Sequence, residues 1–163
     1  MTYIVPTNTK TNMSFQKTTV TTHQNVTTSW TSVNGGQISY TPSSASAKVI
    51  LEFTTAYGRL DPDNSVIFRL QIGNDVSSLG DVVTGNVDYH NGFGATATTN
   101  NMNHSDIITL KYHLDGWAGS KVLQIQCQTY NSNSSLEGIV NGMRPTSTDP
   151  ILPFNPFIMV YEV

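Results

Sequence analysis

The chain has 163 residues with 8 Lys and Arg against 11 Asp and Glu, which gives a net charge of −3, and only 12% of its residues are charged. The absence of a basic run argues against a nucleic-acid partner. No apolar run approaches the ~20 residues that span a bilayer, so insertion into a membrane is not expected either.

The length predicts a single domain. Residues 1–12 contain few apolar side chains, and we expect them to form an extended N-terminal arm ahead of one domain over residues 13–163. No charged-then-apolar secretion signal occurs at the N-terminus. The single Cys127 cannot form an internal disulfide, and its strand-like neighbours indicate a buried thiol.

Strand patterns begin directly after the arm. Residues 15–22 and 25–30 are Thr-rich, which is typical of strands. The tripeptide NGG at residues 34–36 predicts a hairpin turn. The next stretch, 37–55, contains two strand patterns separated by Pro42, which should lie at a strand end because it has no N–H to donate.

Small residues follow Pro42 and should let the backbone turn or pass closely to another segment. A long strand pattern then begins at Lys48. Its two faces alternate, with Val49, Leu51 and Phe53 on one side and Lys48, Glu52 and Thr54 on the other.

Further segments alternate in the same way after a predicted loop at residues 57–64. Residues 65–73, 105–115 and 121–130 each place apolar side chains at every second position. The inward residues we predict are Val66, Phe68, Leu70, Ile72, Ile108, Leu110, Tyr112, Leu114, Leu123, Ile125 and Cys127. An outward row is predicted for Gln124, Gln126 and Gln128.

The remaining segments are the connection at residues 116–119, one short strand within residues 136–140, a Pro-rich loop at residues 142–156 and a last strand at residues 157–163. No window of ten or more residues shows a convincing helical period. Many short strands with turn signals between them predict an all-β fold. We expect an antiparallel β-sandwich of the size of a jelly roll.

The last strand predicts an oligomer because both of its faces are largely apolar. Phe157, Met159 and Tyr161 point one way, and Ile158 and Val160 point the other. One face can join the core of the domain, and the other needs a second cover, which is either the other sheet of the same chain or another subunit. Closed cyclic symmetry is the default for copies of one chain.

No motif in the sequence indicates an enzyme, a metal site or a cofactor. The four histidines form no H-x-H or HExxH pattern, and Asp61-x-Asp63-x-Ser65 lacks the glycine and the closing acid of a calcium loop. The acidic residues, including Glu52 and Glu162, could pair as a glycosidase dyad only if the fold brought two together. We therefore expect no catalytic residue, no cofactor and no bound metal.

Loop aromatics are the candidates for ligand contact. Trp117 lies among glycines in a predicted connection, and Tyr89 lies in a weak strand pattern. Both could stack on a sugar ring. Local packing is the alternative for each.

Two segments resemble parts of known proteins. ISYTPSSASAKVILEF, within residues 37–55, resembles a segment common in virion proteins of tailed bacteriophages, and FIMVYEV at the C-terminus is similar to the terminal strand of the same group. Trp30, shortly before the NGG tripeptide, is similar in placement. The resemblance implies a tumour-necrosis-factor-like jelly roll that forms homotrimers on fibres or as capsid decoration, and it implies no catalytic residues.

The resemblance covers both ends of the domain and hardly touches residues 79–103. Fibre members of the group usually carry long N-terminal attachment regions, whereas about twelve residues precede the first strand pattern here. This difference favours a stand-alone decoration subunit over the tip of a longer fibre.

The main hypothesis is therefore a non-enzymatic virion protein, a trimeric capsid decoration or short head or tail fibre protein at the virion surface that contacts other capsid or tail proteins. The alternative is a host-attachment module that binds a surface glycan or another receptor. A small polysaccharide hydrolase is a third and weaker hypothesis.

Overall fold

The computed structural model describes residues 11–59, 66–80, 87–90, 105–129, 138–143 and 150–163. These residues form an all-β fold with antiparallel sheets, and their one helical element is the short 3-10 helix η1 (Val76–Ser78). The strands are β1 (Thr11–Lys17), β2 (Gln24–Val26), β3 (Thr31–Tyr40), β4 (Lys48–Arg59), β5 (Val66–Gly73), β6 (Val87–His90), β7 (Ser105–Asp115), β8 (Lys121–Thr129), β9 (Gly138–Val140), β10 (Gly142–Met143), β11 (Leu152–Pro153) and β12 (Phe157–Glu162).

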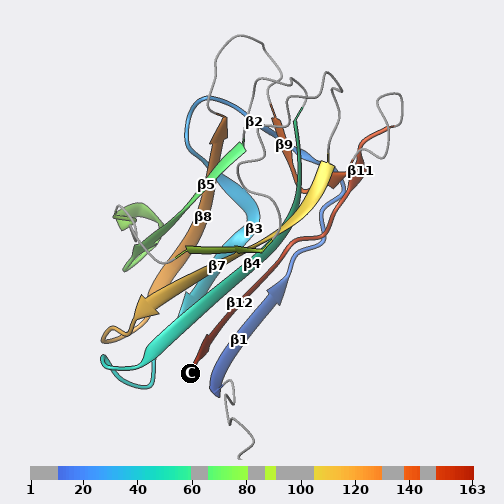
Figure 1. Ribbon diagram of the computed structural model, residues 1–163. Coiled ribbons are helices and arrows are strands. Elements are labelled where there is room, and N and C mark those ends of the chain that lie inside the picture. Colours follow the sequence, from blue (N-terminus) through green and yellow to red (C-terminus); the bar gives the residue numbers. More distant parts are fainter. Residues whose placement is uncertain (1–10, 60–65, 81–86, 91–104, 130–137, 144–149) are drawn as a thin grey trace, which may run out of the picture.

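Two main sheets make up the described part of the chain. The larger has the order β1-β12-β4-β7-β6, with β9 bridging β4 and β2, and the smaller has the order β3-β8-β5. Figure 1 shows β1, β12, β4 and β7 side by side, with β3, β8 and β5 behind them. A separate pair is formed by β10 and β11.

The strand pairs are nested along the chain. The first strand pairs with the last, β1 with β12; inside that pair β3 pairs with β8, and inside that one β4 pairs with β7. Further pairing joins β12 to β4 in one sheet and β8 to β5 in the other. The first and last described strands therefore lie side by side in the larger sheet, where β12 lies between β1 and β4.

Buried side chains from both sheets form one core. The predicted alternation of β4 is confirmed, since Leu51 and Phe53 have no exposed surface. The inward phases of β5, β7 and β8 are confirmed as well, with Phe68 and Ile72 partly buried against the core. Residues that are opposed in an antiparallel pair point to the same face of the sheet. The residues of β12 and β7 that are paired with Leu51 or Phe53 therefore face this core as well.

The predicted hairpin turn at Asn34-Gly35-Gly36 is wrong, because the tripeptide lies inside β3. The register against β8 shifts between Ser32 and Gln37, and Gly35 has φ +78°. The glycines thus permit a bulge, in which extra residues leave the ladder without ending the strand.

The bulge also explains why one residue of the predicted outward row is buried. Gln124 is only 2% exposed. Its Nε2 donates to the carbonyl oxygens of Gly36, at 3.4 Å, and Ile125, at 2.9 Å. An amide can lie in such a place because the backbone of the bulge accepts its hydrogen bond.

Several predicted boundaries shift. β1 begins at Thr11, within the predicted arm, and residues 1–10 lie outside the described residues. The strand predicted at 25–30 is reduced to β2. The loop predicted at 57–64 begins too early, because β4 continues to Arg59 by pairing with β9. The rest of that loop also lies outside the described residues.

Gly73 at the end of β5 should not tolerate a side chain. A Cβ there would lie 2.4 Å from the carbonyl oxygen of Ser78, whereas at Gly80 the nearest atom would be 3.7 Å away. We expect Gly73→Ala to lower the free energy of unfolding by about 2 kcal/mol through overpacking against backbone. Urea unfolding would measure it, and Gly80→Ala is the matched control, expected within about 0.5 kcal/mol of the wild type. Equal losses in both variants would contradict the prediction.

Candidate functional site

The candidate site is the outer face of the larger sheet, which points away from the core and carries buried side chains, paired polar groups and an apolar patch. The side chains that occupy it alternate with the core residues of β12, β4 and β7. Ile50 and Tyr161 are opposed on this face, and both are buried although neither belongs to the core cluster. The centre of this outer face is therefore largely shielded from water by its own side chains.

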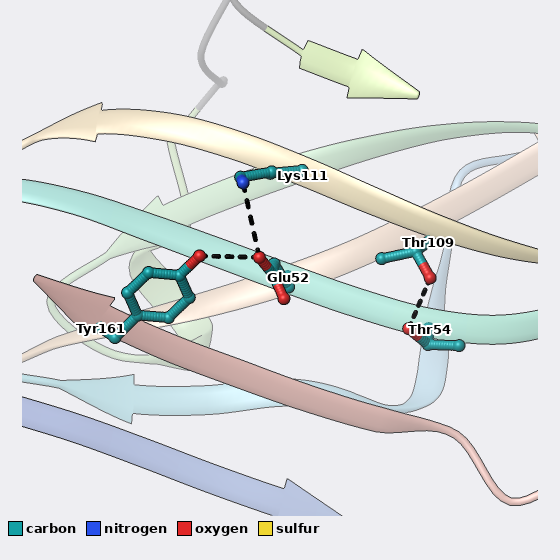
Figure 2. Close-up of polar contacts among 5 residues, drawn as sticks. All are labelled: Glu52, Thr54, Thr109, Lys111 and Tyr161. Carbon is teal, nitrogen blue, oxygen red and sulfur yellow. Dashed lines mark hydrogen bonds and ion pairs between the residues drawn. The ribbon is translucent and has the colours of Figure 1, made fainter. Parts of the chain in front are cut away.

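The polar groups at the centre of the outer face bind one another. Figure 2 shows Tyr161 and Lys111 converging on Glu52 from the strands on either side of β4. The Tyr161 hydroxyl donates to Glu52 Oε1 at 2.7 Å, and Lys111 Nζ lies 3.6 Å from the same oxygen. Burial, followed by the bond to Glu52, raises the pKa of Tyr161 well above its usual value.

Two residues beyond Glu52 on β4, the hydroxyl of Thr54 forms a hydrogen bond of 2.8 Å with the hydroxyl of Thr109 on β7 (Figure 2). Thr54 is almost fully buried. The Thr54–Thr109 and Tyr161–Glu52 bonds leave fewer polar groups for a second surface to satisfy, although covering the Glu52–Lys111 ion pair would cost desolvation energy.

An apolar patch adjoins this polar network on β1 and β12. It consists of Met13, Phe15, Phe157 and Met159. Phe15 is opposite Met159 in the register, and its ring centroid is 6.0 Å from that of Phe157. Met13 and Phe15 are each 57% exposed, which is unusual for large apolar side chains in neighbouring positions.

The structure separates the five predicted interface residues into three groups. Ile158 and Val160 are fully buried in the chain's own core, so they have no surface to offer a second copy. Tyr161 is buried on the outer face and bound to Glu52. Phe157 and Met159 are half-buried on the same face and belong to the apolar patch.

A second polar cluster lies at the end of β12, on the core side. The carboxylate of Glu162, a 7% exposed residue, accepts from the backbone N–H of Ser43 at 2.6 Å, the Ser43 hydroxyl and Asn12 Nδ2 at 2.8 Å. The Tyr40 hydroxyl lies 3.3 Å from Glu162 Oε1 and shares its one proton between that oxygen and the nearer Asn12 carbonyl. These bonds, with those from Ser43 the largest cause, lower the pKa of Glu162 to about 2. Burial and the same carboxylate raise the pKa of Tyr40 to about 12.

This Glu162 cluster was not predicted from the sequence, although a signal was present. Glu162 has the same phase as the core residues Ile158 and Val160, and an inward acid requires donors. The donors come from Asn12 in β1 and from Tyr40 and Ser43 at and after the end of β3, and the acceptor lies in β12. One hydrogen-bonded cluster thus joins three segments that are distant in the sequence.

Trp117, one of the two predicted ligand contacts, lies apart from the outer face. Trp117, in the connection between β7 and β8, packs partly buried against the core and meets Tyr40 edge-on at 6.2 Å. Its indole N–H is buried with no hydrogen-bond partner. Tyr89 lies in β6, opposite Leu110 of β7. The guanidinium of Arg69 stacks over the ring of Trp30, with its Cζ 4.3 Å from the ring centroid.

Within the described residues, no group of three or more His, Cys, Asp and Glu side chains is placed to hold a metal ion. Cys127 is fully buried, and burial raises the pKa of its thiol to about 12, which makes it unreactive as a nucleophile. No helix in the described ranges has the length and apolar content to cross a bilayer.

Comparison of the whole chain with protein-family models, curated proteins and solved structures gives no match. The outer face and the chemistry of its residues are therefore the features that bear on function.

Proposed function

We propose that the chain is a non-enzymatic structural protein of a virion, a homotrimer that decorates a capsid or forms a short head or tail fibre. The observation that carries the proposal is the outer face of the larger sheet. It combines an exposed apolar patch with polar groups that already bind one another. Such a surface favours a protein partner over a small ligand.

The nested strand order supports a jelly-roll sandwich as the architecture. Pairing of β1 with β12, β3 with β8 and β4 with β7 is the pattern of one long hairpin wrapped into two sheets. The adjacency of β12 to β4 and of β8 to β5 is the pairing that such wrapping produces. This order agrees with the tumour-necrosis-factor-like fold that the sequence resemblance implies.

The charge of the outer face supports contact between identical copies. Glu52 and Lys111 form an ion pair at its centre, so their charges balance. When the same face meets itself around a symmetry axis, any net charge is repeated in every copy and repels. The Glu52–Lys111 pair avoids that penalty at the centre of the face, whereas Lys17, opposite Phe157 in the register, adds one positive charge beside the apolar patch.

We do not include glycan binding through Trp117 in the proposal. Its indole packs against the core and Tyr40, which leaves less of the ring for stacking on a sugar. The virion location rests on the sequence resemblance together with a surface built for protein contacts.

Phe15→Glu should convert the protein to a monomer. Light scattering after size exclusion should give the wild type a mass three times that of the 17.8 kDa chain, and the variant the mass of one chain. The reason is that each copy would bring a new charge into the apolar part of the contact, where it would lose its hydration. Val76→Glu is the matched control, because Val76 is 56% exposed against 57% for Phe15 but lies on η1.

A wild type that is monomeric at micromolar concentration contradicts the trimer, and so does a Phe15→Glu protein that keeps the wild-type mass. The virion location has its own test, which is electron cryomicroscopy of purified particles from cells that make the protein. Trimeric density on capsid or tail supports the proposal, and particles that lack the protein contradict it.

A further inference from the structure

The apolar patch is built from the two ends of the chain. Met13 and Phe15 come from β1, and Phe157 and Met159 come from β12. Among the described strands, β1 pairs with β12 alone and forms the edge of the sheet. Half of the patch therefore depends on a single strand pairing.

That pairing is interrupted where the Glu162 cluster contacts β1. The register between β1 and β12 shifts between Thr11 and Ser14, and Asn12 has φ +44°. A bulge of this kind leaves backbone groups outside the ladder. Side-chain bonds hold the bulge instead: the Asn12 carbonyl accepts from the Tyr40 hydroxyl, and Asn12 Nδ2 donates to Glu162 Oε1 and to the Thr41 carbonyl.

Glu162 is also bound by Ser43, which belongs to the segment between β3 and β4. Ser43 donates its backbone N–H and its hydroxyl to the two carboxylate oxygens. Figure 1 shows the C-terminal end of the chain beside the start of β1. The carboxylate thus connects β1 to the segment between β3 and β4, which is not paired with β1.

We propose that Glu162 acts as a latch that holds β1 against β12 and so completes the surface through which copies of the chain contact each other. This inference rests on the proposed oligomer. When the latch opens, β1 leaves with Met13 and Phe15, β12 becomes an exposed edge, and the remaining sheet keeps its pairing of β12 with β4. The oligomer then dissociates although the core of each copy stays folded.

Hydrogen exchange of the full chain, read by mass spectrometry together with light scattering, tests the latch. In Glu162→Gln we expect the amides of β1 to exchange at least about tenfold faster while those of β8 change little. The concentration at which the oligomer dissociates should rise by about the same factor. Asp115→Asn is the matched control, because it also removes one negative charge at this end of the sheet, where Asp115 is exposed and paired with Lys48.

Asn12→Gly is the second variant, since it removes the side chain that donates to Glu162 and to the Thr41 carbonyl and keeps a residue that accepts positive φ. It should reproduce the faster exchange of β1 without altering the charge or the core. Unchanged exchange of β1 in both variants overturns the latch. Faster exchange with an unchanged oligomer overturns the claim that β1 completes the contact and leaves the proposed trimer standing. A monomeric wild type with faster exchange in the variants refutes the trimer, and with it the contact that β1 would complete, but supports the hold of Glu162 on β1.

Discussion

Asn141→Ala is expected to lower the free energy of unfolding by about 3 kcal/mol. Asn141 is fully buried between the two sheets. Its Oδ1 accepts from the Thr55 hydroxyl at 2.7 Å and its Nδ2 donates to the Asn34 carbonyl at 2.9 Å. Two lost bonds cost about 1 kcal/mol each, and alanine at φ +57° adds about 1 kcal/mol of strain.

Asn141→Gly separates these contributions, because glycine accepts the left-handed conformation without strain. It loses the same two hydrogen bonds, so we expect it to be about 1 kcal/mol more stable than Asn141→Ala. Urea unfolding at one fixed protein concentration would measure both, since association would otherwise change the apparent stability. A loss below 1 kcal/mol in Asn141→Ala would show that the bonds between the sheets matter little.

Thr55→Val provides a coupling test for the same site. Removing the hydroxyl leaves Asn141 Oδ1 without its donor in a place that water does not reach. The Asn141→Ala and Thr55→Val losses should then add to more than the loss in the double variant. Strict additivity would indicate that the two side chains do not act as a pair.

The strand phases could be predicted from the sequence because the burial of one face produces a period of two. Phe53 and Leu110 are opposed in the register and fully buried, as alternation required. The small residues after Pro42 were expected to allow a close approach, and this is confirmed at Gly116. Its N–H donates to the Ala47 carbonyl at 2.7 Å, and a Cβ there would lie 2.6 Å from the Ser44 oxygen.

The bulges could not be predicted, because a local turn signal does not tell whether the chain reverses. Asn34-Gly35-Gly36 permits a hairpin, but β8 pairs with β3 on both sides of it and keeps the strand continuous. That choice is made by a partner almost a hundred residues away in the chain. Gln124 shows the same dependence, since its burial follows from the carbonyl of Gly36.

The apolar outer face was predicted only in part. Phe157 and Met159 could be assigned to one side of the last strand by alternation alone, and they lie on the outer face. The sequence could not show that β1 would place Phe15 beside Phe157, or that the Tyr161 hydroxyl would donate to Glu52. Contacts between the two ends of a chain depend on topology, which a local pattern does not contain.

Acid should destabilise the protein through Glu162. Its pKa in the folded state is about 2, against an ordinary 4.5. A carboxyl group with a lowered folded pKa stabilises the fold fully above its unfolded pKa, and this contribution disappears as pH falls through the folded value. The free energy of unfolding should therefore decrease from about pH 4.5 down to about pH 2, as Glu162 loses the charge that holds the bonds from Ser43 and Asn12.

Glu162→Gln should remove this dependence and cost about 2–3 kcal/mol at neutral pH, because a neutral amide cannot accept from all the donors around the carboxylate. Tyr40, the other titratable group that faces the site, has its pKa raised to about 12 and does not change charge in acid. Asp115 also has a lowered pKa, caused mainly by its bond from Lys48, but it is exposed, so Asp115→Asn should leave most of the slope in place. Urea unfolding at a series of pH values would measure all three proteins, and a slope that survives in Glu162→Gln would assign the acid sensitivity to other carboxylates.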